Sequence, residues 1–233
     1  MAYKEDKREK VELTEKNKPQ SNTQRDNITL VTAYFLLPPF RKGKKSIIAK
    51  IFKQPNYPVH YPNTVIPEYN CVSHAKFELL KWSIEQNYYH TKYFIWIDIG
   101  YFRMRVQNTF GLSLPPDFDE RKVVLSQVED VQNFLTLEEI VQYNLNWVAG
   151  GAILGRYDVL RKFCLKYLLF IKQSLEMGII GAEQQMLYAM YSDSYRMRKE
   201  DIQICSEGWF CLGHLAVATW LQERNSNKLR RNV

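Results

Sequence analysis

The sequence predicts an α/β fold in which a single mixed, mostly parallel sheet is flanked by helices. Two observations support this expectation. Strand-type segments, rich in β-branched and aromatic residues, alternate along the chain with segments whose apolar residues recur at helical spacing. The 233 residues, 45% of them hydrophobic, are enough to bury one sizeable core and too few for two. We therefore expect one domain at 28–223, between a charged arm at 1–27 and a basic tail at 224–233.

The amino-terminal half begins with a segment that cannot form a core. Residues 1–27 carry seven basic and six acidic side chains and almost no large apolar groups, so we expect a disordered arm. Residues 28–35 predict the first strand, and a proline-dotted stretch with a short helix at 45–52 follows. Ser73 is expected to cap a helix, which leads into a strand that ends at Asp98.

The carboxy-terminal half contains clearer signals for where helices begin and end. Thr136 and Glu139 form a capping box that opens a helix. Gly178 is placed to end a long helix whose core face runs from Leu160 to Leu175. The remaining elements are expected as strands at 123–127, 147–154 and 201–205 and as helices from about 181 and at 214–222.

The net charge of +7 comes from two local excesses of basic residues. One is an unopposed block consisting of Arg41, Lys42, Lys44, Lys45, Lys50 and Lys53, and the other is the tail. Such patches favour polyanions or are simply solvated surface. No helix-turn-helix or RNA-binding signature accompanies them, so we expect no sequence-specific nucleic acid. The absence of a long apolar stretch or an apolar leader indicates a cytoplasmic protein without a transmembrane segment.

The four cysteines do not have the spacing of a metal site. Cys71, Cys164, Cys205 and Cys211 include no Cys-x-x-Cys pair, and Cys164 lies on the apolar face of the long helix. Buried free thiols are therefore expected in preference to a zinc site or a disulfide framework.

Asp98 is the most informative single position. It follows the apolar run Tyr93 to Ile97 and comes two residues before Gly100. An ionised carboxylate in the middle of a buried strand would cost several kcal/mol unless it were paired, so Asp98 is expected at the strand's end. The carboxyl ends of strands line the ligand crevice in open α/β sheets, where Asp98 would meet a metal, a ribose or a sugar hydroxyl. The alternative is an aspartate that caps the next turn.

Three short blocks combine polar side chains with glycines: Trp96 to Gly100, Asn146 to Gly151 and Gly181 to Gln185. Together they resemble the conserved blocks of the bacterial HtrL/YibB-like family, which is expected to contain glycosyltransferases with the nucleotide-diphospho-sugar transferase (GT-A) fold. The likeness covers Thr29 to Phe35, Ile66 to Arg103, Trp147 to Gly155 and Gly181 to Leu187. Between 36 and 65 the chain departs from the family, because a short basic, proline-rich stretch replaces part of the nucleotide pocket.

The resemblance implies a role for Asp98 beside the diphosphate of a nucleotide-activated sugar. There it would contact the ribose or a divalent metal, Mn²⁺ or Mg²⁺, which stabilises the charge that develops on the departing diphosphate. Gly100 replaces the second acidic residue of the usual Asp-x-Asp pattern. His214 is a candidate for a late metal ligand, and Arg103 would pair with the diphosphate or with Asp98, or lie on the surface.

The other two blocks would contact the sugar. Gly150 and Gly151 would let the sugar lie against the strand backbone, or they form a sheet bulge. Trp147 would offer an aromatic face, or it belongs to the core. Glu183, beside Gln184, would act at the reacting centre as a general base or charge stabiliser, or it complements a helix dipole.

The expected function is therefore the transfer of a sugar from a nucleotide-activated donor to an unidentified hydroxyl acceptor. The alternative is a non-catalytic, degenerate member of the same fold that binds polyanions or proteins.

Overall fold

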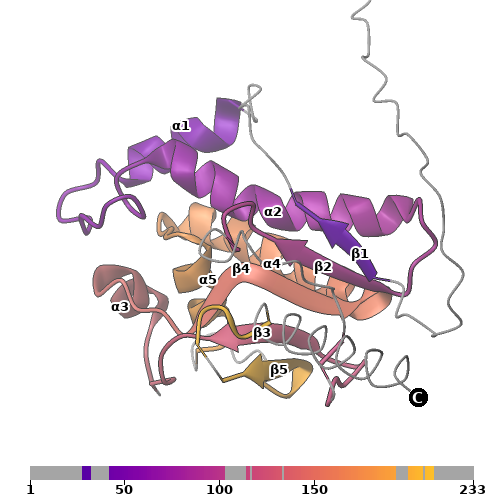
Figure 1. Ribbon diagram of the computed structural model, residues 1–233. Helices are drawn as coiled ribbons and strands as arrows, with labels where there is room; N and C mark the ends of the chain where they lie inside the picture. Colours follow the sequence, from indigo (N-terminus) through magenta and orange to yellow (C-terminus); the bar gives the residue numbers. More distant parts are fainter. Residues whose placement is uncertain are drawn as a thin grey trace, which may run out of the picture.

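The computed structural model describes residues 28–32, 42–102, 114–115, 117–132, 134–192, 199–206 and 208–212. One five-stranded mixed sheet has the order β1-β2-β4-β3-β5 (Figure 1). The strands are β1 (Ile28–Val31), β2 (Tyr93–Ile97), β3 (Val123–Gln127), β4 (Val148–Arg156) and β5 (Ile202–Cys205). The α/β class and the mixed sheet are confirmed.

Strand direction determines where the ends of the strands meet. β1 is parallel to β2 and β3 is parallel to β5, whereas β4 is antiparallel to both of its neighbours, β2 and β3. Four strands therefore point the same way, although only half of the pairings are parallel. The start of β4 consequently lies between the carboxyl ends of β2 and β3, which brings Asp98 close to Gly150 and Gly151.

The helices are α1 (Lys42–Ile51), α2 (Pro67–Gln86), α3 (Leu137–Gln142), α4 (Tyr157–Met177) and α5 (Glu183–Met190), with a short 3₁₀ helix η2 (Lys199–Asp201). α2 and α4 pack side by side over the sheet (Figure 1), and the rings of Phe77 and Tyr167 stack between them with centroids 3.6 Å apart. The main core joins these helices to one face of the sheet.

Alternation explains why β2 is apolar throughout. Phe94 and Trp96 belong to the main core, whereas Ile95 and Ile97 belong to a smaller cluster on the opposite face. Successive side chains of a strand point to opposite faces, so a strand covered on both sides is apolar at every position. By the same alternation Asp98 follows Trp96 toward the helical face.

Two predicted helix boundaries are confirmed and one is wrong. Thr136 and Glu139 form the capping box of α3, and Gly178 ends α4 in the left-handed conformation at φ 77°. Helix α2, however, begins at Pro67, six residues before Ser73. The Ser73 hydroxyl donates to the carbonyl of Asn70 inside the helix, a local bond that serine makes within helices as well as at their starts.

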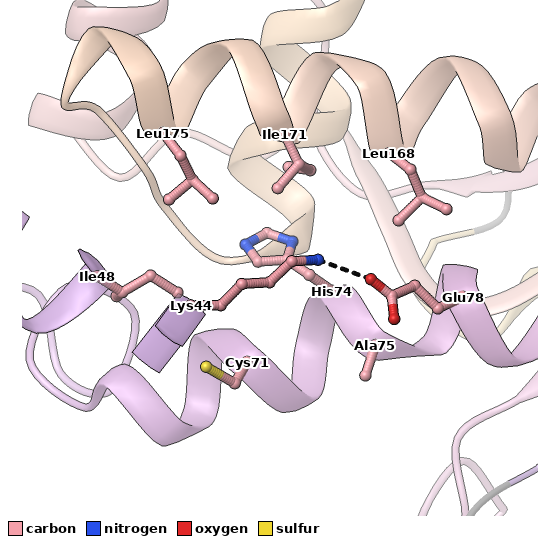
Figure 2. Close-up of a pocket in the computed structure, with 9 residues that line it drawn as sticks. All are labelled: Lys44, Ile48, Cys71, His74, Ala75, Glu78, Leu168, Ile171 and Leu175. Atoms are coloured by element: carbon pink, nitrogen blue, oxygen red, sulfur yellow. Dashed lines mark hydrogen bonds and ion pairs between the residues drawn. The ribbon is translucent and has the colours of Figure 1, made fainter. Parts of the chain in front are cut away.

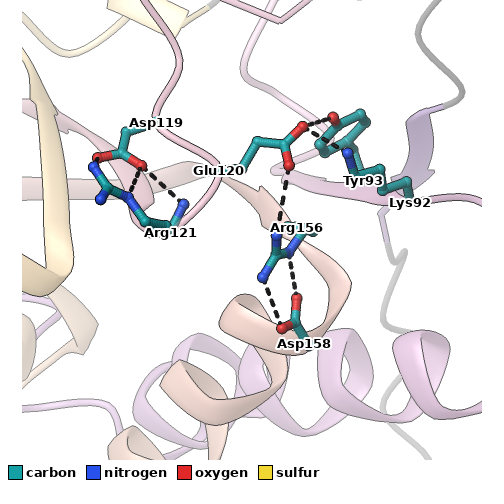
Figure 3. A network of polar contacts seen from close by, with 7 residues as sticks. All are labelled: Lys92, Tyr93, Asp119, Glu120, Arg121, Arg156 and Asp158. Atoms are coloured by element: carbon teal, nitrogen blue, oxygen red, sulfur yellow. Dashed lines mark hydrogen bonds and ion pairs between the residues drawn. The ribbon is translucent and has the colours of Figure 1, made fainter.

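A polar network joins the start of β2 to the end of β4, at the edge of the sheet away from Asp98 (Figure 3). Arg156, which precedes α4, pairs with Asp158 at 2.7 Å and with Glu120 at 3.5 Å. Glu120 also accepts from Lys92 and from the hydroxyl of Tyr93. The charges of this network are matched within the chain, and its contacts hold the loop before β3. We therefore look for a ligand site at the other edge of the sheet, where Asp98 lies.

The cysteine prediction is only partly confirmed. Cys71 and Cys164 are buried free thiols, as expected. Cys205 and Cys211 form a disulfide, with Cα atoms 5.9 Å apart, so the expectation of four free thiols is wrong. Spacing along the chain does not show that the end of β5 and the turn after Gly208 lie side by side.

The basic block is not unopposed. Lys44 pairs with Glu78 at 2.6 Å and Lys45 pairs with Glu68 at 2.5 Å, because α1 packs along the acidic side chains of α2. No described helix is long and apolar enough to cross a membrane. The arm at 1–27, the helix expected at 214–222 and the tail at 224–233 lie outside the described residues.

Candidate functional site

Asp98 lies directly after the end of β2, where the sequence predicts it. Its backbone N–H donates to the carbonyl of Gly151 at 2.9 Å, which continues the pairing of β2 with β4 by one residue. The indole N–H of Trp96 donates to Asp98 Oδ1 at 2.7 Å. The side chain of Asp98 is 43% exposed, so its carboxylate is held in place from inside the protein and is open to ligands from outside.

Lys76 is the centre of the site, and sequence reasoning missed it. Its side chain is only 5% exposed, and Nζ lies 3.1 and 3.3 Å from the two carboxylate oxygens of Asp98. Nζ also donates to the carbonyl of Gly150 at 3.0 Å and to Glu183 Oε1 at 3.1 Å. We call Lys76, Asp98, Glu183 and the Gly150 carbonyl the Lys76 cluster. The signal was present: Lys76 stands three residues after Ser73 and four before Leu80, on the buried stripe of α2.

Glu183 opens α5 and faces into the protein rather than out to solvent. Its side chain is 5% exposed, Oε1 accepts from Lys76, and Oε2 is buried with no hydrogen-bond partner among the described residues. Burial alone would raise the pKa of Glu183, but the charge and hydrogen bond of Lys76 outweigh burial and lower it. Glu183 is therefore an ionised carboxylate with one oxygen still able to accept a hydrogen bond.

The Lys76 ammonium remains charged because the two carboxylates beside it stabilise its positive charge. Burial lowers the pKa of Lys76, but the carboxylates of Glu183 and Asp98 raise it further than burial lowers it. With both carboxylates ionised, the formal charge of the Lys76 cluster is −1. A buried ammonium of this kind is stable only because each N–H finds an oxygen acceptor.

The two glycines lie at a sheet bulge, which is one of the two alternatives that the sequence offered. Pairing between β3 and β4 shifts where Leu125 is opposite Ile153 while Ser126 is opposite Ala149, so β4 bulges at the glycines. A Cβ at Gly150 would lie 2.7 Å from Cγ of Glu183, and a Cβ at Gly151 would lie 3.1 Å from the ring of Tyr101. The group that approaches Gly150 closely is thus the chain's own Glu183.

Two side chains hold the loop that leads into Glu183. The hydroxyl of Tyr57 donates to the carbonyl of Ile180 at 2.6 Å and accepts from its N–H at 2.8 Å. His74 bonds the carbonyl of Gly181 through Nε2 at 3.0 Å and the hydroxyl of Tyr167 through Nδ1 at 2.8 Å. Burial lowers the pKa of His74 to about 4, so the ring is neutral and its role is structural.

The other predicted residues fall into three groups. Trp147 is a buried core side chain whose ring packs against Tyr188 and Tyr191 at centroid distances of 6.1 and 5.8 Å. Gln184 is half-buried beside Glu183 at the start of α5. Arg103 and His214 lie outside the described residues.

Tyr69 is a further residue of the site that sequence reasoning missed. It is 37% exposed and precedes Lys76 by two helical turns, on the same side of α2. Burial raises the pKa of Tyr69, and the Glu183 and Asp98 carboxylates raise it further. Tyr69 therefore interacts electrostatically with the Lys76 cluster.

The described residues around Asp98 do not fit the divalent metal expected there. Among the described residues no three His, Cys, Asp or Glu side chains converge as a metal site. The space between the carboxylates of Asp98 and Glu183 is taken by Nζ of Lys76, 3.1 Å from an oxygen of each. An ion there would need oxygens at roughly 2.0–2.6 Å and would overlap with the ammonium.

A separate hollow lies between α1, α2 and α4 (Figure 2). It is bordered mostly by aliphatic side chains, with the Lys44–Glu78 ion pair across it and His74 at its back. Because the two charges satisfy each other, we assign this hollow no ligand.

The fold and the site define an α/β protein with a buried lysine–carboxylate cluster at the carboxyl ends of its strands. Residues 45–213 match the family described as bacterial protein of unknown function (HtrL_YibB), and the chain belongs to that family. The family resemblance read from the sequence is thereby confirmed. The match includes residues 45–65, within the stretch expected to depart from the family, and excludes Thr29 to Phe35. No curated protein and no solved structure gave a significant match.

Proposed function

We propose that this protein is a glycosyltransferase that moves a sugar from a nucleotide-activated donor to a hydroxyl acceptor. The observation that carries the proposal is Asp98, a 43% exposed carboxylate at the end of β2, next to the buried Lys76–Glu183 pair. Ligands of open α/β sheets bind where the carboxyl ends of strands face solvent. The GT-A fold that we expect for the family would place a nucleotide-sugar at the same edge.

The chemistry of the cluster suits a polyhydroxylated ligand. Asp98 and Glu183 retain acceptor capacity beyond their bonds to Lys76, and Glu183 Oε2 has no other described partner. Ionised carboxylates make strong hydrogen bonds to hydroxyl donors. Asp98 would accept from the ribose or from the donor sugar, while Arg103 would pair with the diphosphate.

Glu183 would act at the reacting centre. Its lowered pKa keeps it in the form that accepts a proton from an attacking hydroxyl or stabilises positive charge on the sugar. Lys76, Tyr57 and His74 would keep the carboxylate in place by holding its oxygen and the preceding loop.

The test is thermal stability of the purified protein against a panel of nucleotide-sugars, compared with the variant Asp98→Asn. Ligands that bind only the folded state raise its melting temperature. At a ligand concentration of a hundred times Kd, the free energy of unfolding increases by about 2.7 kcal/mol. We expect one donor to raise the melting temperature of the wild-type protein and to leave Asp98→Asn unchanged. The same shift in both proteins would contradict the role of Asp98, and no shift with any donor would favour the non-catalytic alternative.

Asp98→Asn is expected to fold, because Lys76 keeps Glu183 and the Gly150 carbonyl as acceptors and the new amide would stand in a half-exposed position. A large loss of stability together with retained turnover would contradict the proposal. The rival function, polyanion binding, is weakened because two lysines of the basic block are paired with glutamates. Such binding would weaken steeply with salt, whereas donor binding would not.

A further inference from the structure

The Lys76 cluster has the arrangement of a cation site that is filled by the chain itself. Four oxygens from three separate segments converge on Nζ: two of Asp98, one of Glu183 and the carbonyl of Gly150, all at 3.0 to 3.3 Å. Carboxylate and carbonyl oxygens are the ligands that hard divalent ions prefer. Here they surround an ammonium.

The sequence shows the matching change on the strand side. Position 100 is Gly100, so the second carboxylate that would complete an Asp-x-Asp metal site is absent, and a Cβ there would meet nothing within 4 Å. A metal site with a second aspartate would hold three carboxylates and a divalent ion, which gives a formal charge of −1. The Lys76 cluster holds two carboxylates and one ammonium, so its formal charge is the same. A divalent ion in place of the ammonium would face the same two carboxylates at closer range.

We propose that Lys76 replaces the divalent ion at this site, as a positioning residue that holds Asp98 and Glu183, and that the site binds its ligand without Mn²⁺ or Mg²⁺. The identity of that ligand rests on the proposed function. The inference that Lys76 occupies the place of a divalent ion does not. The site would therefore select its ligand by hydroxyl donors rather than by a metal-bridged diphosphate.

The experiment measures Mn²⁺ binding by electron paramagnetic resonance, in which free Mn²⁺ gives a sharp signal that is lost on binding. We expect the wild-type protein and Asp98→Asn to bind the same amount of Mn²⁺, because no ion uses Asp98. In Lys76→Met the oxygens are released and their charge becomes −2, so we expect a new Mn²⁺ site at least about tenfold tighter than any in the wild type. The double variant Lys76→Met/Asp98→Asn should lose that site.

A wild-type Mn²⁺ site that Asp98→Asn abolishes would overturn the proposal. Lys81→Met is the matched control, since Lys81 lies on the same helix and pairs only at the surface with Glu85. If Lys76→Met fails to fold, the comparison of the wild type with Asp98→Asn still decides. Once a donor is known, a donor-induced rise in melting temperature that disappears with EDTA would also overturn the proposal, whereas failure of every donor affects only the proposed function.

Discussion

Single residues at this site are tightly interdependent, because one ammonium serves both carboxylates. Removing either acid leaves Lys76 with the other, but removing Lys76 leaves two carboxylates without a cation. Breaking a buried ion pair from one side typically costs about 3–5 kcal/mol, because a buried charge is left uncompensated. The lysine is therefore the residue whose loss should do most damage to the site.

Gly150 should be replaceable only if Glu183 is removed. In Gly150→Ala the new Cβ would overlap with Cγ of a buried glutamate, at 2.7 Å, and we expect a loss of about 1–3 kcal/mol in the free energy of unfolding. Chemical denaturation would measure it. Gly100→Ala is the matched control, since a Cβ there meets nothing within 4 Å.

A double-mutant cycle identifies the cause of that loss. In the background of Glu183→Ala the clash is absent, so Gly150→Ala should cost much less than in the wild type. Equal costs in both backgrounds would show that backbone conformation, and not Glu183, requires the glycine.

His74 should make stability depend on pH between about 6.5 and 4. Its pKa is lowered by burial to about 4 in the folded protein, so the unfolded chain takes up the proton first as the pH falls. Stability from the neutral ring is complete above pH 6.5 and decreases toward pH 4, by roughly 3 kcal/mol. Unfolding free energies of the wild type and His74→Gln over this range would measure the difference. Identical curves for the two proteins would refute it.

At the scale of elements, two helix boundaries could be predicted from local chemistry, whereas the predicted start of α2 is six residues too late. The capping box at Thr136 and the terminating Gly178 depend on local chemistry that the sequence displays directly. The start of α2 has a local signal as well, because Pro67 stands at its first position, but a serine that bonds within the helix resembles one that caps it.

Two glycine substitutions should change stability in opposite directions. Gly178→Ala forces a side chain into the left-handed region at φ 77° and should cost about 1 kcal/mol. Gly43→Ala lies in the first turn of α1 with open space around it and should gain about 0.5 kcal/mol. Thermal or chemical denaturation would test both, and a gain from Gly178→Ala would contradict the assigned helix end.

For the whole molecule, the sequence predicts the α/β class, the position of every described strand and the place of Asp98 at a strand end. It does not predict Lys76, the Cys205–Cys211 disulfide or the ion pairs of Lys44 and Lys45. Each of these depends on segments that are distant in the chain or on a turn whose path is set by packing. Periodicity reports which face a residue takes, but not which residue it meets there.

The disulfide gives a direct test of the folded chain. In denaturant without reductant, two of the four cysteines should react with a thiol reagent, and all four should react after reduction. Closing so short a loop should stabilise the protein by about 2 kcal/mol, so reductant should lower the melting temperature. Four reactive thiols before reduction would contradict the pairing. Disulfides are rare in the cytosol, so the same count on protein alkylated inside its host cells tests the expected cytoplasmic location.

The Lys76 cluster also has a consequence for the order in which the protein folds. Lys76 is separated along the chain by 22 residues from Asp98, by 74 from Gly150 and by 107 from Glu183. Contacts this distant form slowly, because long loops must close before the contacts return any free energy. The cluster is therefore complete only after α2, β2, β4 and α5 have all come together. During synthesis, no partial chain ending before α5 would hold the complete Lys76 cluster.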